Sequence, residues 1–245
     1  MNEANMPLAG KTYWLIGASE GLGRELAVQL DQAGARLVLS ARSTSKLAAL
    51  TQELTQARAL PMDVTDATAV RRTCAELGPV DGVIYNAGAY EPMATQDWQA
   101  DSVLQMADVN FIGALRVLGE IMPRFVAQGH GDITLIGSLA GYRGLPNAVG
   151  YGASKAALIS LAETMRHDLK GSGITVRLIN PGFIKTRLTD KNTFKMPMLM
   201  TATSAAQQVL SAMQSRRFRT DFPRPFSWGI KLYSLLPDLM AYRGR

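Results

Sequence analysis

Short apolar runs recur along the 245-residue chain, and most of them are continuously apolar instead of alternating with polar positions. Runs of this kind are typical of strands that are buried on both faces of a parallel sheet. Segments with the 3.6-residue period of a helix lie between the runs. The strands predicted in this way are residues 12–17, 36–40, 57–62, 82–86, 132–138 and 175–180, with a seventh near 219–222.

The helical segments are marked by apolar residues three or four positions apart. Leucines spaced from Leu22 onward define a helix after the first strand, and Thr65 with Asp66 predicts the N-cap of another. Longer helices are predicted over residues 101–127 and 151–170. This alternation predicts an α/β fold of one domain over the whole chain, a doubly wound parallel sheet of about seven strands flanked by helices.

The composition narrows the class of protein. Hydrophobic residues make up 47% of the chain, enough to bury a large core. The N-terminus lacks the features of a signal peptide, and no apolar run reaches the length of about eighteen residues that a spanning helix needs. With Cys74, His130 and His167 as the whole supply of cysteine and histidine, neither an internal disulfide nor a Cys/His zinc site can form. We therefore expect a soluble cytoplasmic protein without a bound metal.

The positive charge is concentrated near the C-terminus. The net charge is +6, and residues 216–245 alone hold seven basic and two acidic side chains, a contribution of +5. The nearly neutral remainder lacks the basic face that binds nucleic acid. We therefore expect no nucleic-acid partner.

The tail over residues 223–245 also carries apolar side chains. Phe226, Trp228, Leu232 and Leu236 are interleaved with basic residues, a pattern that suits a helix on a membrane surface. Packing of these side chains on the body or on a neighbouring subunit is the favoured interpretation, and it predicts that they are buried.

A glycine-rich turn follows the first predicted strand, where residues 17–23 read Gly-Ala-Ser-Glu-Gly-Leu-Gly. Glycines let a backbone approach a pyrophosphate closely, and the following helix N-terminus offers free N–H groups and positive potential. The stretch also contains Gly-x-Ser-x-Gly, the nucleophile elbow of α/β-hydrolases. A serine hydrolase is the weaker alternative, because only sixteen residues precede the turn and His167 lies inside a predicted helix.

Three further segments complete a family pattern. Residues 86–88 read Asn-Ala-Gly after the fourth strand, Ser138 ends the fifth, and residues 151–155 read Tyr-Gly-Ala-Ser-Lys at the start of a long helix. With the glycine loop, they resemble the compact single-domain branch of the short-chain dehydrogenase/reductase family over residues 8–215. The resemblance implies a Rossmann-type fold and hydride transfer between a nicotinamide and a carbonyl or alcohol carbon.

Two positions depart from the family's pattern. Ile16 stands where a threonine usually precedes the loop, and Tyr85 replaces the first asparagine of the Asn-Asn-Ala-Gly segment. Both positions are structural, so the departures concern local hydrogen bonding and not the chemistry.

The resemblance assigns catalysis to Asn110, Ser138, Tyr151 and Lys155. Tyr151 would exchange a proton with the substrate oxygen, while Ser138 would donate a hydrogen bond to that oxygen. Lys155 lies four residues after Tyr151, on the same helical face, where its charge and that of the oxidised nicotinamide favour the phenolate and lower the pKa of the tyrosine. By resemblance, Lys155 also holds the nicotinamide ribose and Asn110 holds a water of the proton relay.

The resemblance also implies a set of cofactor contacts. Within it, Asp63 accepts from the adenine amino group, while Ile184 and Thr186 hold the carboxamide. The whole set is Gly17, Ser19, Gly21, Leu22, Gly23, Arg42, Asp63, Val64, Asn86, Ala87, Gly88, Tyr151, Lys155, Pro181, Gly182, Ile184 and Thr186.

The residues after the second strand favour NADP(H) over NAD(H). An acidic side chain there would accept from the ribose hydroxyl of NAD, whereas an arginine pairs with the 2′-phosphate of NADP. Ala41 occupies the acidic position and Arg42 follows it. Glu20 points the other way, since many NADP-dependent members carry a basic residue there; Ser19 is available to donate to the phosphate in compensation.

Residues 183–203 are the expected substrate lid. Its methionines, among them Met196, Met198 and Met200, suit a bulky apolar substrate or fill the core below the loop. The resulting prediction is an NADP(H)-dependent reductase of an apolar ketone or aldehyde, assembled as a homo-dimer or tetramer. A non-catalytic NADP-sensing binding protein is the alternative, although its expected loss of the Tyr-Lys pair or of the serine is not observed.

Overall fold

The computed structural model of the protein describes residues 8–241. Seven strands form one sheet in the order β3-β2-β1-β4-β5-β6-β7, and every neighbouring pair is parallel. The predicted sheet is therefore confirmed. The strands are β1 (Thr12–Ile16), β2 (Arg36–Ser40), β3 (Ala57–Ala59), β4 (Gly82–Tyr85), β5 (Gly131–Ile136), β6 (Ile174–Pro181) and β7 (Arg219–Phe222).

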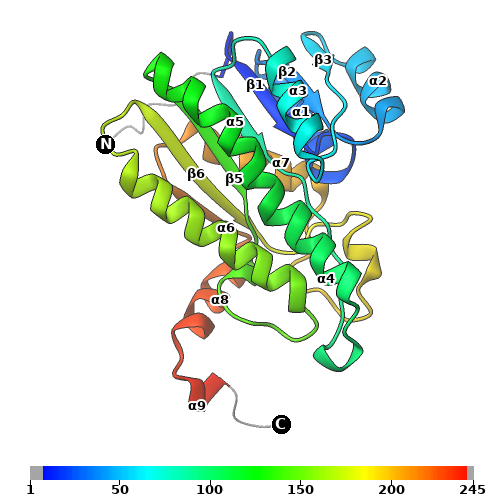
Figure 1. Cartoon of the computed structure of the whole chain (residues 1–245). Helices are drawn as coiled ribbons and strands as arrows, with labels where there is room; N and C mark the ends of the chain where they lie inside the picture. The colour runs from blue at the N-terminus through cyan, green and yellow to red at the C-terminus, as the bar shows by residue number, and fades with distance from the viewer. Residues whose placement is uncertain (1–7, 242–245) are drawn as a thin grey trace.

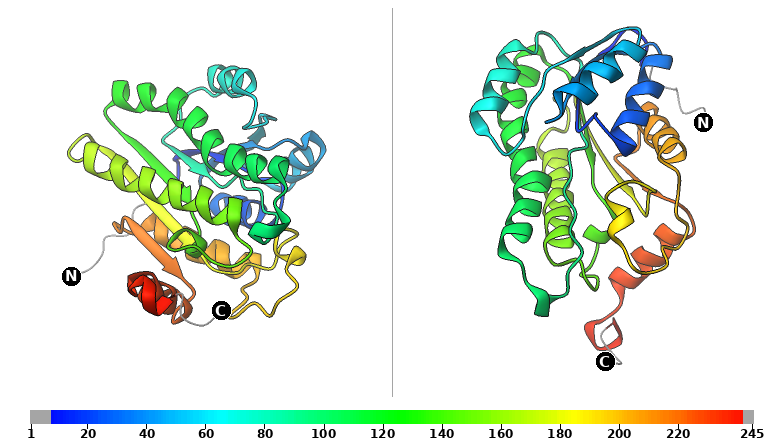
Figure 2. Two further views of the ribbon diagram at one scale, coloured as in Figure 1. Left: turned by 60° about the horizontal axis from the view of Figure 1, so that its bottom comes forward. Right: turned by 90° about the vertical axis from the view of Figure 1, so that its right-hand side faces the viewer.

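Helices cover both faces of the sheet (Figures 1 and 2). Residues of α3, α5 and α6 share one hydrophobic cluster with the sheet, and residues of α1, α2 and α7 share another. The principal helices are α1 (Gly21–Gln32), α2 (Thr44–Glu53), α3 (Ala67–Glu76), α4 (Ala100–Ala107), α5 (Gly113–Gln128), α6 (Val149–Asp168), α7 (Ala202–Gln214), α8 (Phe226–Leu235) and α9 (Asp238–Ala241).

The apolar runs reflect this double cover. Successive side chains of a strand point to opposite faces of the sheet. In β1, Trp14 and Ile16 belong to the cluster with α3, α5 and α6, whereas Tyr13 and Leu15 belong to the cluster with α1, α2 and α7. All four side chains are at most 1% exposed, so both faces of this part of the strand are buried.

Several predicted boundaries need correction. The third strand ends at Ala59 and not at residue 62, although the chain still follows β2 there, with Leu60 N donating to Leu39 O. Asp66 alone caps α3, accepting hydrogen bonds from Thr68 N and Ala69 N. Helix α7 was not predicted.

The prediction of one continuous α-helix over residues 101–127 is wrong, because a π-helical turn interrupts it. The segment consists of α4, a π-helical turn at Asp108–Ile112, and α5. The side chain of Asn110 binds Ala89 in a neighbouring loop from within the turn. A local period cannot reveal such an interruption, because its cause lies in another segment of the chain.

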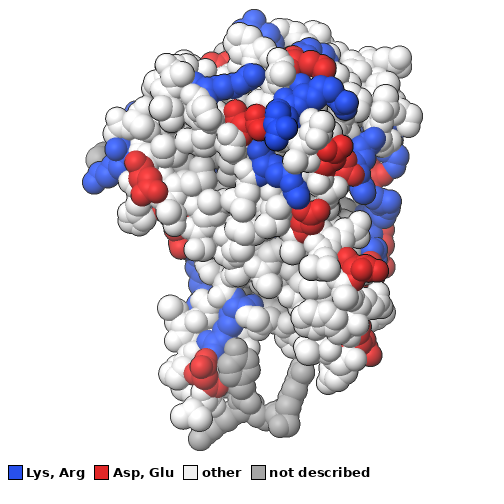
Figure 3. Space-filling model, viewed as in Figure 1, with Lys and Arg blue, Asp and Glu red and all other residues white. Residues whose placement is uncertain are grey.

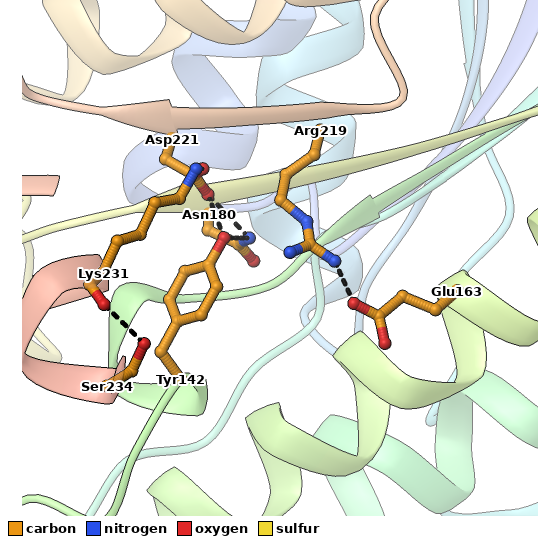
Figure 4. Close-up of polar contacts among 7 residues, drawn as sticks. All are labelled: Tyr142, Glu163, Asn180, Arg219, Asp221, Lys231 and Ser234. Atoms are coloured by element: carbon orange, nitrogen blue, oxygen red, sulfur yellow. Dashed lines mark hydrogen bonds and ion pairs between the residues drawn. The ribbon is translucent and has the colours of Figure 1, made fainter. Parts of the chain in front are cut away.

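The C-terminal helix α8 is fastened to the body at one side. Lys231 pairs with Asp221 of β7, and the Tyr142 hydroxyl and the Asn180 amide donate to the other Asp221 oxygen at 2.8 Å (Figure 4). Arg143 donates to three backbone carbonyls at the end of α8.

The opposite side of α8 is open within a single chain. Trp228 is 58% exposed and Leu232 is 66% exposed, so the expected burial against the body is wrong for both; burial against a neighbouring subunit stays a prediction. Over residues 8–241, none of the helices is long and apolar enough to cross a membrane.

Candidate active site

A cavity of about 970 Å³ lies beyond the carboxyl ends of β1, β4, β5 and β6. The strand order changes direction beside β1, and ligands bind at such switch points in open α/β sheets. Every predicted cofactor contact except Gly23 lines this cavity, and so does Ser138. Asn110 is fully buried behind its wall.

The glycine loop forms a cradle in which backbone meets backbone. Gly17 has φ +84°, and a Cβ on it would lie 2.7 Å from the backbone nitrogen of Ala87. A Cβ on Gly23 would collide with the carbonyl oxygen of Gly17, which itself accepts a 2.9 Å hydrogen bond from the Asn86 side chain. The residues present thus fit a dinucleotide, because its pyrophosphate needs this close approach to backbone N–H groups.

Asp63 and Thr186 lie at two sides of the same cavity. The Asp63 carboxylate accepts from Thr65 N at 2.9 Å and from the Thr65 hydroxyl at 2.8 Å, and this turn holds it at the wall. Thr186 packs on the phosphate loop, since a Cβ on Gly21 would lie 2.9 Å from its methyl group. Their predicted contacts to adenine and carboxamide stay predictions.

The Asn110 side chain binds protein atoms at both ends. Its Oδ1 accepts from Ala89 N at 2.7 Å, and its Nδ2 donates to Ala89 O at 3.0 Å and to the Ser154 hydroxyl at 2.9 Å. It therefore joins the loop after β4 to helix α6, which carries Tyr151 and Lys155. A role in holding a relay water stays a prediction.

Ser138, Tyr151 and Lys155 line the same cavity. Ser138 follows β5, and its hydroxyl accepts from Ala140 N at 3.1 Å, so it also has the structural role of a cap. The Lys155 ammonium donates to the Ile136 carbonyl at 2.8 Å and lies 5.8 Å from the centre of the Tyr151 ring. Burial lowers the pKa of Lys155 to about 8.

In the protein without its cofactor, the pKa of Tyr151 is raised, whereas the sequence analysis expected it to be lowered. Burial raises it above the ordinary value of 10, and the hydrogen bond with Ser138 opposes this shift only in part. The expected lowering includes the charge of the oxidised nicotinamide, so it stays a prediction for the complex. In the chain by itself, the phenol is protonated at neutral pH.

Several groups at the site were not predicted. Tyr90 packs edge-on against the Tyr151 ring, with 4.9 Å between the ring centres. None of the lid methionines lines the cavity; its apolar wall comes instead from Leu145, Phe183, Phe194, Phe226 and Ile230. Lys46 and Arg187 line its outer end. No local pattern could have grouped them, because they come from segments far apart in the sequence.

The serine-hydrolase alternative lacks a base at the site. Ser19 lines the cavity, but neither His130 nor His167 is among the residues that surround it. His167 lies in the last turn of α6.

Comparison with known proteins identifies the family. The family described as short chain dehydrogenase matches residues 11–196. An uncharacterized oxidoreductase of Myxococcus xanthus is 34% identical over 236 residues, 93% of each chain. Ketoacyl reductase HetN of a Nostoc species is 30% identical over 221 residues, 85% of this chain and 77% of that protein.

A solved structure supports the same fold. A short chain dehydrogenase from Burkholderia cenocepacia, in complex with NADP, matches with a TM-score of 0.84 at 22% identity, over 97% of this chain and 96% of that one. The chain therefore belongs to the short-chain dehydrogenase/reductase family and is an NAD(P)-dependent oxidoreductase.

Proposed function

We propose that the protein uses NADPH to reduce an apolar ketone or aldehyde, with Tyr151 as the proton donor. The observation that carries this proposal is the meeting of Ser138, Tyr151 and Lys155 in one cavity with the glycine cradle. The nicotinamide, when bound, supplies the hydride that reduces the carbonyl carbon. Side chains of the protein stabilise the developing charge and transfer the proton.

The raised pKa of Tyr151 suits the reducing direction. As the hydride reaches the carbonyl carbon, negative charge develops on the carbonyl oxygen and needs a proton. Ser138 donates a hydrogen bond to this oxygen and stabilises the charge. Tyr151, held as the neutral phenol, transfers its proton to the same oxygen and becomes a phenolate. Lys155, positively charged below a pKa of about 8, stabilises that phenolate.

The preference for NADP(H) rests on Arg42. Its side chain is exposed at the wall of the cavity directly after β2, where a cofactor ribose lies in this fold. Charge-assisted pairing with a phosphate is stronger than pairing with a hydroxyl. The NADP bound in the Burkholderia structure agrees with this preference.

Aromatic side chains in the cavity wall support the proposal of an apolar substrate. Phe183 packs edge-on against Phe194 at 5.7 Å and lies 5.8 Å from Phe226, measured between ring centres. Such a wall favours a carbonyl compound with an apolar chain or ring. The name of the Nostoc relative, a ketoacyl reductase, points to the same chemical class.

We also infer a homo-oligomer of cytoplasmic location. The surface over α4 and the N-terminal half of α6 carries few charged groups (Figure 3), and Leu104 and Leu115 are exposed close to it. A second copy fits this face, because an uncharged surface pairs with itself around a twofold axis without opposing like charges. Light scattering tests the inference: Leu115→Arg should lower the mass of the assembly, and an unchanged mass would contradict the use of this face.

The proposed function is tested by binding and by turnover. Titration by nicotinamide fluorescence should give a lower Kd for NADPH than for NADH by about 10- to 150-fold, as expected for a hydrogen-bonded charge. Arg42→Ala should narrow this gap mainly by weakening NADPH. Purified protein should then oxidise NADPH with aliphatic or aromatic ketones, aldehydes or oxo-lipids; equal affinities for the two cofactors, or no turnover across this panel, contradict the proposal.

A further inference from the structure

Asp221 in β7 is bonded to three separate segments of the chain (Figure 4). One of its carboxylate oxygens accepts hydrogen bonds of 2.8 Å from the Tyr142 hydroxyl and from the Asn180 amide. The other oxygen is paired with the ammonium of Lys231 in α8. Because the Asp221 side chain is only 5% exposed, solvent screens these contacts little.

The three partners of Asp221 are close in sequence to the cavity wall, although neither they nor Asp221 line it. Tyr142 ends the 3-10 turn that follows β5, and Asn180 lies near the end of β6. Lys231 lies in the middle of α8. The wall residues beside them in sequence are Ser138, Leu139, Pro181, Gly182 and Ile230. From behind the wall, Asp221 therefore joins the segment of the serine, the predicted cofactor loop and the C-terminal helix.

Helix α8 itself forms part of the cavity wall. Phe226 and Ile230 lie four residues apart, on one face of the helix, and both line the cavity. A Cβ on Gly182 would lie 3.3 Å from the Phe226 ring and 3.4 Å from the side chain of Leu139, the residue after Ser138. The helix thus reaches both the segment that carries the serine and the predicted cofactor loop.

Helix α8 has little apolar packing on the body. Of its ten residues only Ser227 is buried, and the large apolar side chains on its outer face are exposed. Polar contacts take over the task of holding it: Arg143 binds the end of the helix, and Asp221 binds its middle through Lys231. Since Lys231 directly follows Ile230, the pair with Asp221 fixes the part of α8 that faces the cavity.

We propose that Asp221 is a positioning residue that sets the choice of substrate. Through Lys231 it holds α8 at the cavity, where Phe226 and Ile230 cover the apolar part of a bound carbonyl compound. A substrate with an apolar chain or ring that reaches α8 is stabilised by this cover, whereas a short carbonyl compound is not. The proposal rests on the proposed reduction of an apolar ketone or aldehyde.

The ratio of kcat/KM for 2-decanone to kcat/KM for 2-butanone measures this cover. Lys231→Met should lower the ratio about 10- to 20-fold, as expected when two methylene groups of the long ketone lose buried contact, and should leave the Kd for NADPH within about twofold. Lys231→Arg keeps the charge and should restore most of the ratio. A pair that only stabilised the fold would change the reduction of both ketones equally.

Glu163→Gln is the matched control for loss of an ion pair in the same network. Glu163 of α6 is paired with Arg219, which lies two residues before Asp221 in β7, and this pair does not involve α8 (Figure 4). The substitution should leave the ratio unchanged. A fall in the ratio as large as that of Lys231→Met would contradict a specific role for the pair between Asp221 and Lys231.

Asp221→Asn separates the pair with Lys231 from the other contacts of Asp221. The amide oxygen still accepts from Tyr142 and Asn180, whereas the amide group that replaces the other oxygen carries no charge to pair with Lys231. This variant should lower the ratio as much as Lys231→Met, and the double variant should lower it no further. The double variant leaves no buried charge unpaired, so it tests the proposal even if Lys231→Met is unstable. An unchanged ratio in the double variant overturns the proposal.

A binding measurement distinguishes failure of this proposal from failure of the proposed function. Decanamide has the chain of a long carbonyl compound but is not reduced by hydride, and calorimetry measures its binding to the NADPH-loaded protein. If the wild type reduces the ketones and Lys231→Met changes neither the ratio nor decanamide binding, the function stands and the role of Asp221 is wrong. If the wild type neither reduces the ketones nor binds decanamide, both are wrong. Weaker decanamide binding by Lys231→Met, without turnover of any ketone, supports the role of Asp221 and contradicts the proposed reduction.

Discussion

The hydroxyl of Tyr85 donates a hydrogen bond of 2.5 Å to the carbonyl oxygen of Val109, in the π-helical turn between α4 and α5. Tyr85 ends β4 and is 1% exposed. Room for its hydroxyl exists because residue 113 is glycine: a Cβ there would lie 2.5 Å from the Tyr85 oxygen. The tyrosine that departs from the family's sequence pattern thus holds the turn that carries Asn110.

Replacing Tyr85 by phenylalanine should destabilise the fold. The substitution leaves the Val109 carbonyl without its donor, at a cost of about 1–3 kcal/mol in the free energy of unfolding. Urea unfolding measures the loss. Tyr13→Phe is the matched control, because the Tyr13 hydroxyl is also buried but lies a longer 3.5 Å from Asp132; an equal or greater loss in the control would contradict the assigned role.

Tyr151→Phe should abolish turnover and spare cofactor binding. It removes the transferable proton while keeping the ring that packs against Tyr90. We expect kcat to fall by at least about 100-fold, the usual contribution of a positioned acid, with the Kd for NADPH within about twofold. Tyr90→Phe preserves the aromatic contact and should stay active. A Tyr151→Phe enzyme with most of its turnover would exclude this residue as the proton donor.

Lys155 should make stability depend on pH. Burial lowers its pKa from 10.5 to about 8 in the folded chain. Between these values the unfolded chain holds a proton that the folded chain has lost, so the free energy of unfolding rises with pH over this window. Below pH 8 the buried charge costs on the order of 3 kcal/mol.

The Lys155→Met variant isolates this contribution. It should gain stability over the wild type near pH 7.5, and the difference should shrink toward pH 10.5, where the lysine is neutral in both states. Urea unfolding of both proteins at several pH values across this range gives the comparison. A difference that is constant with pH would show that the lysine has an ordinary pKa.

Arg143→Ala should loosen the C-terminal helix. The guanidinium donates to the carbonyls of Tyr233, Ser234 and Leu236 and pairs with Asp238 at 2.6 Å. Its loss removes these hydrogen bonds, although the Tyr233 carbonyl still accepts from Leu236 N at 3.2 Å. We expect about 1–3 kcal/mol less stability and faster amide exchange over residues 226–236. Arg143→Lys should recover only part of the lost stability, because an ammonium group cannot donate in the several directions that the planar guanidinium does. Unchanged exchange in Arg143→Ala would refute the anchoring role.

A substitution on the exposed face of α8 can show whether this face binds a neighbouring subunit or a membrane surface. If a neighbouring subunit covers Leu232, Leu232→Glu should lower the assembly mass in size-exclusion chromatography, since a buried charge without a partner is strongly unfavourable. The monomer should keep its melting temperature, because the side chain is exposed in a single chain. An unchanged mass, together with salt-sensitive binding of the wild type to anionic vesicles that Leu232→Glu abolishes, would favour the membrane surface instead.

Sequence alone predicted the parallel sheet, and all but one of the predicted cofactor contacts line the cavity. Strands buried on both faces need unbroken apolar runs, so β1 could be located from its composition. Gly17 and Gly23 could be assigned because the close backbone contacts leave no room for a side chain, and only glycine meets that requirement. Ser138 and Tyr151 were expected in one site because the motifs that carry them resemble those of the short-chain dehydrogenase/reductase family.

Only the tertiary structure decided the contacts between segments that no local period connects. The turn at Asn110 depends on Tyr85, about 25 residues earlier, and on Ser154 in another helix. The pairing of Glu20 with Lys46 and Arg187 joins a loop, a helix and the segment predicted as the lid, so the charges of the separate residues do not reveal the net charge at that end of the cavity. These groups interact through space, and burial and proximity, which set their energies, exist only once the chain has folded.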